Sequence, residues 1–315
     1  MAIDKKFIDQ FINVTSKAAL ASSYLIGKKD KIAADKAAVD SMRNELNKID
    51  MRGEVVIGEG TLDEAPMLYT GEIVGTKKGL NFDIAIDPVE GTNFVANNLP
   101  GSISVLSIAE KGNLFKAPET YMNKIATGKI DKGLIDLDFP LKKNIKNLSE
   151  FKNKDISSLT VCLLDRPRHK KIIDELKELN VNLKLISDGD VLGAIYVSQP
   201  KYGVDMFLGI GGGPEGVIAA SALDAYDCHF QGRFIFDSDK NIKEAESMGI
   251  KDLNKKYNLN EIIKGDSIFC ATGITNSEIL NGIVLDQNSY TSETLVTHKS
   301  ANLKKIIKKK NSIDE

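Results

Sequence analysis

The sequence has few of the residues that build disulfide frameworks and thiolate metal sites. Its 315 residues include three cysteines and three histidines. The cysteines Cys162, Cys228 and Cys270 lie far apart without C-x-x-C spacing, which indicates buried thiols in a reducing compartment. No run reaches eighteen apolar residues, and acidic residues interrupt the first ten positions, so we expect a cytoplasmic protein with no membrane partner.

An excess of charge of one sign is also missing. With 42 basic and 44 acidic side chains the formal net charge is −2, which does not favour nucleic acid as a partner. The exception is KKIIKKK at 304–310, which we interpret as a solvated face of a terminal helix or as a fraying tail. The hydrophobic share of 42% is typical of a globular protein with substantial cores.

Alternating elements along the chain predict an α/β fold. The predicted helices lie at 4–27, 31–49, about 167–180, about 190–199 and from 214. The predicted strands are EVVIGE, FDIAID, SISVLSIAE, LTVCLLD, LKLIS, VDMFLGI, RFIFD, SIFCATG and SETLVTH. The stretch 110–155 is less periodic and predicts a connection, so we divide the chain into two α/β halves, 1–150 and 151–315.

The helix at 31–49 carries an acid in its apolar stripe. The stripe consists of Ile32, Asp35, Val39, Met42, Leu46 and Ile49, which alternate steps of three and four residues. An unpaired buried carboxylate costs several kcal/mol, so Asp35 needs a cation or a place at the edge of the core. The alternative is an acid near the start of a helix, where the helix dipole favours it.

Further carboxylates stand where strands end. Glu59 closes EVVIGE, and the segment DIAIDPVEGT at 83–92 ends its strand with Asp87, Pro88 and Glu90. Proline stops the ladder and turns Glu90 back toward Asp87, so that hard oxygen ligands suited to Mg²⁺ or Mn²⁺ face one spot. Ligands of α/β proteins gather outside the carboxyl ends of strands. The alternative is an Asp-Pro turn followed by an exposed glutamate.

The segment DIAIDPVEGT resembles the signature of the lithium-sensitive, metal-dependent sugar phosphatase superfamily, which includes inositol monophosphatases and fructose-1,6-bisphosphatases. With DKIAADKAAVDSMR, VVIGEG, LLDRPRHK, SDGDV and GIGGGPEGV, the chain is similar to the class II fructose-1,6-bisphosphatases from about residue 20 to 300. The resemblance implies a layered αβαβα architecture with mixed sheets. It also implies a homodimer or homotetramer that hydrolyses the 1-phosphate of fructose 1,6-bisphosphate, with Mg²⁺ or Mn²⁺ and with water as the nucleophile.

The same resemblance implies roles for individual acids. Asp35 and Glu59 would hold one cation, and Asp87 and Glu215 a second one, with Glu90 close by. Thr92 would position or help to deprotonate the attacking water, which makes Thr92, Glu59 and Asp87 the expected catalytic residues. Lys31, one helical turn before Asp35, would neutralise a phosphate or the acidic cluster. The half 1–150 would thus bind metal and the half 151–315 substrate, within one compact catalytic unit.

The expected substrate contacts follow from the resemblance as well. Arg166 and Arg168 would hold the phosphate that is not cleaved, since forked guanidinium groups suit phosphate. Asp188 and Asp190 would accept sugar hydroxyls, although Asp188 would serve equally well as a helix cap. The remaining contacts would come from Tyr121, from the backbone of Gly212, and from the turn Glu90, Gly91 and Thr92 at the scissile phosphate.

Other functions remain open at this stage. Gly211, Gly213 and Gly216 satisfy G-x-G-x-x-G, and Asp237 follows about twenty residues later, as in NAD-dependent dehydrogenases. The charge of Glu215 inside that loop opposes a pyrophosphate, and the family more often has alanine where Gly213 stands. Within the phosphatase class, sedoheptulose 1,7-bisphosphate is an alternative substrate, and inositol phosphates fit less well. A phosphosugar-binding regulator without catalysis is the alternative outside the enzymes.

Overall fold

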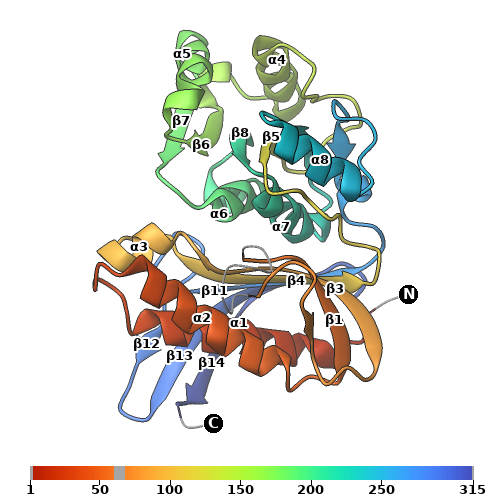
Figure 1. Cartoon of the computed structure of the whole chain (residues 1–315). Coiled ribbons are helices and arrows are strands. Elements are labelled where there is room, and N and C mark those ends of the chain that lie inside the picture. The colour runs from red at the N-terminus through yellow and green to blue at the C-terminus, as the bar shows by residue number, and fades with distance from the viewer. Residues whose placement is uncertain (1–2, 60–67, 314–315) are drawn as a thin grey trace. The chain divides into compact units, whose positions relative to one another are not determined.

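The computed structural model describes residues 3–59 and 68–313, and the chain folds into two compact units. The first unit comprises Met1–Lys116 with Ile263–Glu315, and the second comprises Ala117–Ile262. Each unit combines helices with one mixed β-sheet, which confirms the predicted α/β class with mixed sheets (Figure 1). No helix in the described ranges is long and apolar enough to cross a membrane.

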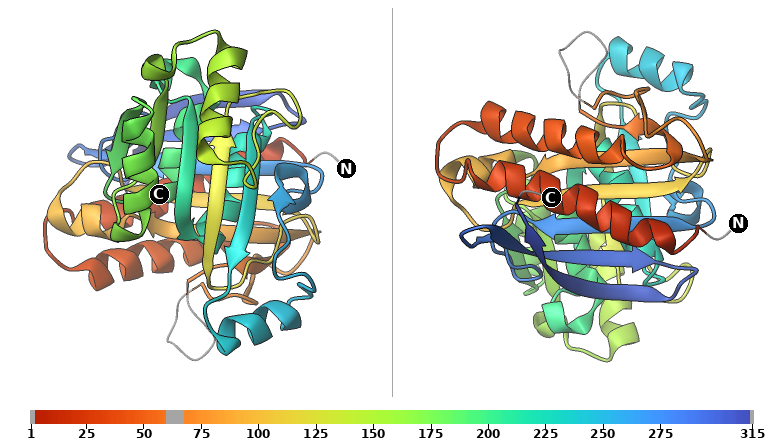
Figure 2. Two further views of the ribbon diagram at one scale, coloured as in Figure 1. Left: turned by 90° about the horizontal axis from the view of Figure 1, so that it is seen from above. Right: turned by 90° about the horizontal axis from the view of Figure 1, so that it is seen from below.

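The first unit packs two long helices on one face of an eight-stranded sheet (Figure 2, right). Its helices are α1 (Lys6–Ser23), α2 (Lys31–Leu46) and the short α3 (Thr92–Asn97). Its strands are β1 (Met51–Ile57), β2 (Ile73–Val74), β3 (Leu80–Glu90), β4 (Ile103–Glu110), β11 (Ser267–Gly273), β12 (Val284–Leu285), β13 (Ser289–His298) and β14 (Leu303–Ser312). They follow the order β12, β13, β11, β4, β3, β1 and β2. Strand β14 pairs with β13 along its whole length.

The core of the first unit lies between this helix pair and the sheet. Phe7 of α1 stacks on Phe11 and meets the ring of Phe82 edge-on from β3, with centroids 5.2 Å apart. Helix α2 begins where the Asp30 carboxylate accepts a hydrogen bond from the Ala33 amide at 2.9 Å, a normal N-cap. The predicted stripe of α2 is wrong at its first position, because Ile32 is 79% exposed.

The lysine-rich segment near the C-terminus forms a strand, so its prediction as a helix face or fraying tail is wrong. All ten residues of β14 pair with β13, from Leu303 opposite His298 to Ser312 opposite Ser289. Leu303 and Ile307 pack against the core of the first unit, and this burial with the pairing overrides the local charge pattern. The lysines then lie along an edge strand, where charge discourages pairing with other chains.

The second unit is a three-layer α/β/α structure. Its strands β5 (Tyr121–Thr127), β6 (Thr160–Leu164), β7 (Asn182–Ile186), β8 (Met206–Gly212), β9 (His229–Ile235) and β10 (Tyr257–Asn258) follow the order β10, β9, β5, β8, β6, β7. Its helices are α4 (Leu141–Lys152), α5 (Lys170–Glu178), α6 (Asp190–Ile195), α7 (Gly213–Asp224), α8 (Asp239–Ser247) and α9 (Leu259–Ile262). Single 3₁₀ turns occupy Ile156–Ser158, Pro167–His169, Tyr196–Ser198 and Pro200–Tyr202.

Alternate residues of the central strands separate the two helix layers of this unit. Met206 and Leu208 of β8 join the core formed with α4 and α5, whereas Phe207 lies beside Gly193 of α6. Figure 2, left, shows α4 and α5, in green shades, lying over the strands of the second sheet.

The stretch 110–155, predicted as a connection, contains two regular elements instead. It includes β5, which pairs with both β8 and β9 inside the second sheet, and helix α4. The chain changes unit within this stretch, at Ala117, and returns to the first unit at Ile263. The division predicted at residue 150 therefore falls inside α4.

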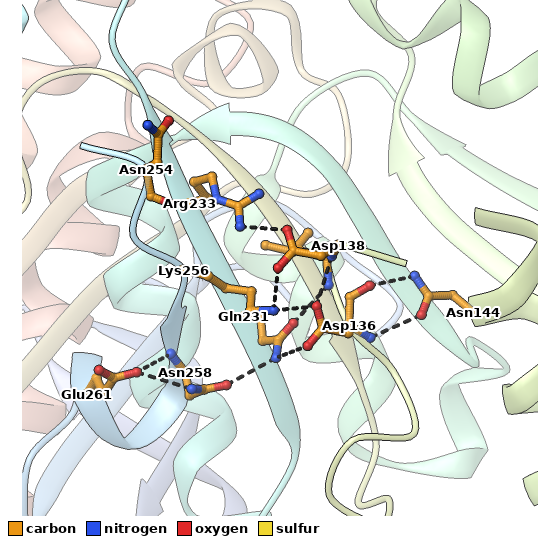
Figure 3. Close-up of polar contacts among 10 residues, drawn as sticks. Asp136, Asp138, Asn144, Gln231, Arg233, Asn254, Lys256, Asn258 and Glu261 are labelled. Carbon is orange, nitrogen blue, oxygen red and sulfur yellow. Dashed lines mark hydrogen bonds and ion pairs between the residues drawn. The ribbon is translucent and has the colours of Figure 1, made fainter. Parts of the chain in front are cut away.

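A network of hydrogen bonds and ion pairs connects the segment before α4 to the edge of the second sheet (Figure 3). The Asp138 carboxylate accepts hydrogen bonds from Arg233 at 2.6 Å and from Lys256 at 2.7 Å, and Lys256 also donates to Asp136. The backbone of Asp136 exchanges two hydrogen bonds with the side chain of Asn144. Burial alone would raise the pKa of Asp136, but its hydrogen bonds, first that from Lys256, hold the pKa below the ordinary 3.8.

We expect Lys256→Met to lower the free energy of unfolding by about 1–3 kcal/mol at pH 7, because the partly buried Asp136 carboxylate loses its charged donor. A lowered carboxylate pKa contributes stability above pH 3.8 that is lost as the pH falls further, so the deficit of the variant should shrink in acid. Urea unfolding at pH 7 and pH 3.5 measures both. The control is Lys255→Met, whose exposed pair with Glu261 should contribute below about 1 kcal/mol; equal losses would contradict the assignment.

Candidate active site

A β-bulge at the end of β3 brings two predicted acids to one face of the first sheet. Asp87 lies opposite Val105 of β4 and Glu90 opposite Ile103, so three steps along β3 meet two along β4. Without the extra residue, an odd spacing would direct the two carboxylates to opposite faces. Pro88 lies inside the bulge, where its missing N–H breaks no ladder bond. In this chain the segment D-P-x-E at 87–90 therefore forms a β-bulge.

The face that carries these acids is the one without the helix pair. Ile84, Ile86 and Val89 belong to the core under α1 and α2, and Asp87 and Glu90 alternate with them. The Asp87 carboxylate accepts a hydrogen bond from the Val89 amide at 3.0 Å, which orients it across the bulge. Both acids thus stand at the carboxyl end of β3, on the side opposite the helices.

Glu59 follows the neighbouring strand at the same edge. Strands β1 and β3 run parallel, with Ile57 opposite Ala85. Glu59 and Asp87 each lie two residues beyond this pair, so both acids occupy the shared carboxyl end of the two strands. The Glu59 amide donates to the carbonyl oxygen of Leu68 at 2.9 Å, whereas Gly60, the last residue of the VVIGEG motif, lies outside the described residues.

Asp35 lies in the second turn of α2 and is half-buried. Burial raises its pKa from 3.8 to about 6, and no described residue offers it a hydrogen bond or an opposite charge. A carboxylate in this condition gains stability from a cation, as the stripe argument predicted. Lys31, in the first turn of α2, is exposed.

The turn after β3 places Thr92 at the start of α3. Gly91 has φ 79° and ψ 51°, a left-handed conformation that favours glycine, and an added Cβ would lie 2.8 Å from the ring of Phe94. The turn thus reverses the chain immediately after Glu90 and leaves Thr92 half-buried as the first helical residue. The hydroxyl of Thr92 follows the bulge acids by two positions.

Glu215 lies in the second unit, just after the point where β8 passes directly into α7. It lies in the first turn of α7 behind Gly213, where burial raises its pKa although Lys124 opposes the shift. Its Oε2 atom is buried, and the described residues offer it no hydrogen bond. An alanine Cβ at Gly212 would lie 1.7 Å from that atom, so glycine is required there. Glu215 is thus a buried acid within the G-x-G-x-x-G motif. A dinucleotide site would bind a negatively charged pyrophosphate at this place, which the acid disfavours.

These carboxylates fit a hard divalent cation in their chemistry. Of these five acids, Asp35 has only burial acting on its pKa, and the buried Oε2 atom of Glu215 has no hydrogen bond within the described residues. Carboxylates without histidine or cysteine suit Mg²⁺ or Mn²⁺. Within 3–59 and 68–313, no group of three or more His, Cys, Asp or Glu side chains is arranged to hold a metal ion.

The predicted substrate residues of the second unit form two pairs. The guanidinium carbon of Arg168 lies 4.9 Å from the centre of the Tyr121 ring, and Arg168 Nε donates to the Ile210 carbonyl at 2.9 Å. Arg166 forms an ion pair of 3.9 Å with Asp188. Asp188 does not cap α6, because Gly189 holds the N-cap position without a side-chain bond. Asp190 is the first residue of α6 and is buried.

A pocket of about 260 Å³ in the second unit contains three of the predicted residues, Tyr121, Gly212 and Glu215. Its wall also includes Glu119 and Asp237. Burial, followed by the charges of Glu215 and Glu244, raises the pKa of Glu119 from 4.5 to about 7. Glu119 carries no signal in the sequence, because it lies just before β5, a strand that the apolar pattern did not predict.

His169 is a second residue whose role could not be predicted from the sequence. The ladder between β6 and β8 ends at Cys162 opposite Phe207, and the buried imidazole of His169 spans the next positions. Its Nε2 accepts the Ile210 amide at 2.7 Å, so Nδ1 carries the proton and donates to the Leu164 carbonyl at 2.7 Å. The backbone of Ile210 is thus held at its N–H by His169 and at its carbonyl oxygen by Arg168.

We expect His169→Phe to lower stability and to raise KM severalfold. Phenylalanine keeps a ring of similar size, but the Ile210 amide and the Leu164 carbonyl lose their partner at a cost of about 1–3 kcal/mol each. The Ile210 carbonyl, which orients Arg168, is then held less firmly. Urea unfolding and steady-state kinetics measure the two effects. The matched control is His229→Phe, since the Nε2 atom of His229 is buried without a partner in the described chain. A control that loses as much as the His169 variant would contradict the bridging role.

Acids at strand ends and arginines on a loop, carried by two α/β units, are typical of enzymes that act on phosphorylated small molecules. The family model described as "Bacterial fructose-1,6-bisphosphatase, glpX-encoded" matches residues 5–311 of the chain. The chain therefore belongs to the family of bacterial, glpX-encoded fructose-1,6-bisphosphatases.

Curated relatives agree with this family over almost the whole chain. A protein of Synechococcus sp. (strain JA-2-3B'a(2-13)) is 40% identical over 93% of this chain and 92% of its own length. One from Prochlorococcus marinus (strain MIT 9515) is 41% identical over the same shares. Both are named D-fructose 1,6-bisphosphatase class 2/sedoheptulose 1,7-bisphosphatase.

Solved structures resemble the chain more distantly. An inositol monophosphatase of Anabaena (Nostoc) sp. PCC 7120 has 16% sequence identity and a TM-score of 0.32, covering 62% of this chain and 71% of its own. An inositol monophosphatase of Thermotoga maritima has 14% identity and a TM-score of 0.33, covering 63% and 79%.

Proposed function

We propose that this protein hydrolyses the 1-phosphate of fructose 1,6-bisphosphate to fructose 6-phosphate and inorganic phosphate. The main support is the family match over residues 5–311. The bulge of β3 adds independent support, because it directs Asp87 and Glu90 to one face beside Glu59. A non-catalytic phosphosugar regulator would have no use for this set of acids.

Asp35, Glu59, Asp87, Glu90 and Glu215 are the residues that we propose to hold Mg²⁺ or Mn²⁺. When bound, divalent cations would neutralise developing charge on the phosphoryl group and lower the pKa of a water. Thr92 follows the bulge acids at the start of α3, and its hydroxyl is proposed to orient the attacking water. The turn Glu90, Gly91 and Thr92 would bind the scissile phosphate through its backbone.

The second unit would hold the rest of the substrate. Arg168 is oriented by Tyr121 and by the Ile210 carbonyl, so its guanidinium is prepared to receive the phosphate that is not cleaved. Arg166 would share this phosphate, and its partner Asp188 would accept a sugar hydroxyl together with Asp190. Gly212 would contribute its backbone. Lys31 remains a proposed contact for phosphate or for the acidic cluster.

Phosphate release by the purified protein tests the proposal directly. The substrates are fructose 1,6-bisphosphate, sedoheptulose 1,7-bisphosphate and inositol 1-phosphate, each with Mg²⁺, with Mn²⁺ or with EDTA. Metal-dependent release from a sugar bisphosphate is the expected result. Release that persists in EDTA, or release from inositol 1-phosphate alone, would contradict the proposal.

Sedoheptulose 1,7-bisphosphate is the second candidate substrate. The curated relatives carry both activities in their names, and one added sugar carbon changes binding only modestly in a pocket that does not read it. The ratio of kcat/KM for the two substrates decides between single and dual specificity.

Cellular location and assembly are also proposals. The three cysteines are buried thiols that form no disulfide with one another, which supports a reducing, cytoplasmic location. We propose a homodimer or homotetramer, which light scattering coupled to size-exclusion chromatography would distinguish from a monomer.

A further inference from the structure

Lys124 is a buried cation in the middle of β5 with an exposure of 1%. A lysine at this depth requires partners for its charge and its donors. Its ammonium group forms an ion pair with the Asp190 carboxylate and donates to the carbonyl oxygen of Gly212 at 2.8 Å. Lys124 was not among the candidate residues, because YMNKIAT contains no pattern that distinguishes this lysine from a surface one.

The partners of Lys124 come from two separate segments of the second unit, the start of α6 and the junction of β8 with α7. Asp190 starts α6, Gly212 ends β8, and Glu215 follows in α7, where the charge of Lys124 acts on it. The packing is close: an added Cβ at Gly211 would lie 2.1 Å from Asp190 Oδ2 and 3.0 Å from Lys124 Nζ. The ammonium group of Lys124 therefore fixes the start of α6 relative to the junction of β8 with α7.

We infer that Lys124 is a positioning residue of the sugar-phosphate site. It holds the Gly212 peptide by its carbonyl group and fixes one carboxylate oxygen of Asp190, which leaves the other oxygen to accept a sugar hydroxyl. The inference rests on the proposed function and adds a residue to the same site. A buried ion pair with a structural role alone would affect stability and leave substrate affinity unchanged.

The test compares Lys124→Met, which keeps length and removes charge, with Lys124→Arg, which keeps charge. The matched control is Lys129→Met, two residues beyond β5, where the lysine is 75% exposed and pairs with Asp227 at 3.6 Å. We expect the methionine variant to raise KM for fructose 1,6-bisphosphate at least about tenfold with a smaller change in kcat. The KM of the arginine variant should lie between those of the wild type and the methionine variant, and the KM of the control should match the wild type.

A double-mutant cycle separates positioning from stability. Asp190→Asn and Lys124→Met should each raise KM. The KM of the double variant should not exceed that of the more damaged single variant, because both changes break the same ion pair. Multiplied effects, or a folded Lys124→Met protein with wild-type KM, would overturn the inference. If Lys124→Met does not fold, Lys124→Arg and Asp190→Asn supply the same comparison.

The wild type in the same assay tells the two claims apart. Phosphate release by the wild type with an unchanged KM in the Lys124 variants overturns the role of Lys124 alone. If the wild type releases no phosphate from any sugar bisphosphate, the proposed function fails. Calorimetric titration with fructose 6-phosphate then decides about Lys124: equal affinity in wild type and variant overturns its role, and at least about tenfold weaker binding supports it.

Discussion

Asp87→Asn is expected to reduce kcat/KM by roughly 1000-fold or more while the protein stays folded. Asparagine keeps the oxygen that accepts the Val89 amide, so the bulge should persist. It removes the negative charge, and a cation held by Asp87 at this strand end would supply several kcal/mol of transition-state stabilisation. Steady-state kinetics over a range of Mn²⁺ concentrations, together with thermal unfolding, measures the two effects.

The same substitution at Asp83 provides the control. Asp83 lies on the same strand four residues earlier and accepts hydrogen bonds from the amides of Gly112 at 2.6 Å and Leu114 at 3.3 Å. Asp83→Asn should therefore keep its activity and lose some stability. A near-normal rate for Asp87→Asn at saturating metal would refute the assignment of Asp87.

Gly212→Ala is the second substitution with a large expected effect. The backbone at Gly212 has φ −59° and ψ 142°, which alanine adopts freely, so the conflict arises from the added Cβ, whose three nearest atoms all belong to the Glu215 carboxylate, with Oε2 at 1.7 Å. Glu215 must move by about an ångström or more, and displacement of that size in an active site costs about 100-fold in rate. We expect that loss in kcat/KM with a thermal midpoint close to that of the wild type.

Gly128→Ala is the matched control for this change. Gly128 follows β5 in the same unit, and its added Cβ would have the Val197 carbonyl oxygen at 3.2 Å as its nearest neighbour. The control should retain full activity. If Gly212→Ala is equally active, the position of Glu215 does not matter for turnover and its proposed role is wrong.

The sequence predicted the strand-end acids because their signal is local. An apolar strand followed by Asp-Pro and a glutamate implies a break in the ladder, and the bulge between Asp87 and Glu90 is that break. The acid in the apolar stripe of α2 was also visible from spacing alone, and the raised pKa of Asp35 agrees with it.

What the sequence did not predict depends on contacts between distant segments. Strand β5 carries Asn123 and the buried Lys124, so its apolar pattern is broken, and only pairing with β8 and β9 makes it a strand. Lysines make up half of strand β14, which acquires its conformation from β13. His169 depends on the separation of β6 from β8, which has no local signature. Propensity is a weak guide wherever tertiary pairing decides.

The discontinuous path of the chain has a consequence for biosynthesis. The second unit is a single uninterrupted segment, Ala117–Ile262, and it can complete its sheet while the ribosome is still adding later residues. The first unit cannot, because β11 lies between β4 and β13 and is translated after the whole second unit. Until then β4 offers an unpaired apolar edge, the state in which a nascent chain is most exposed to aggregation and to chaperones.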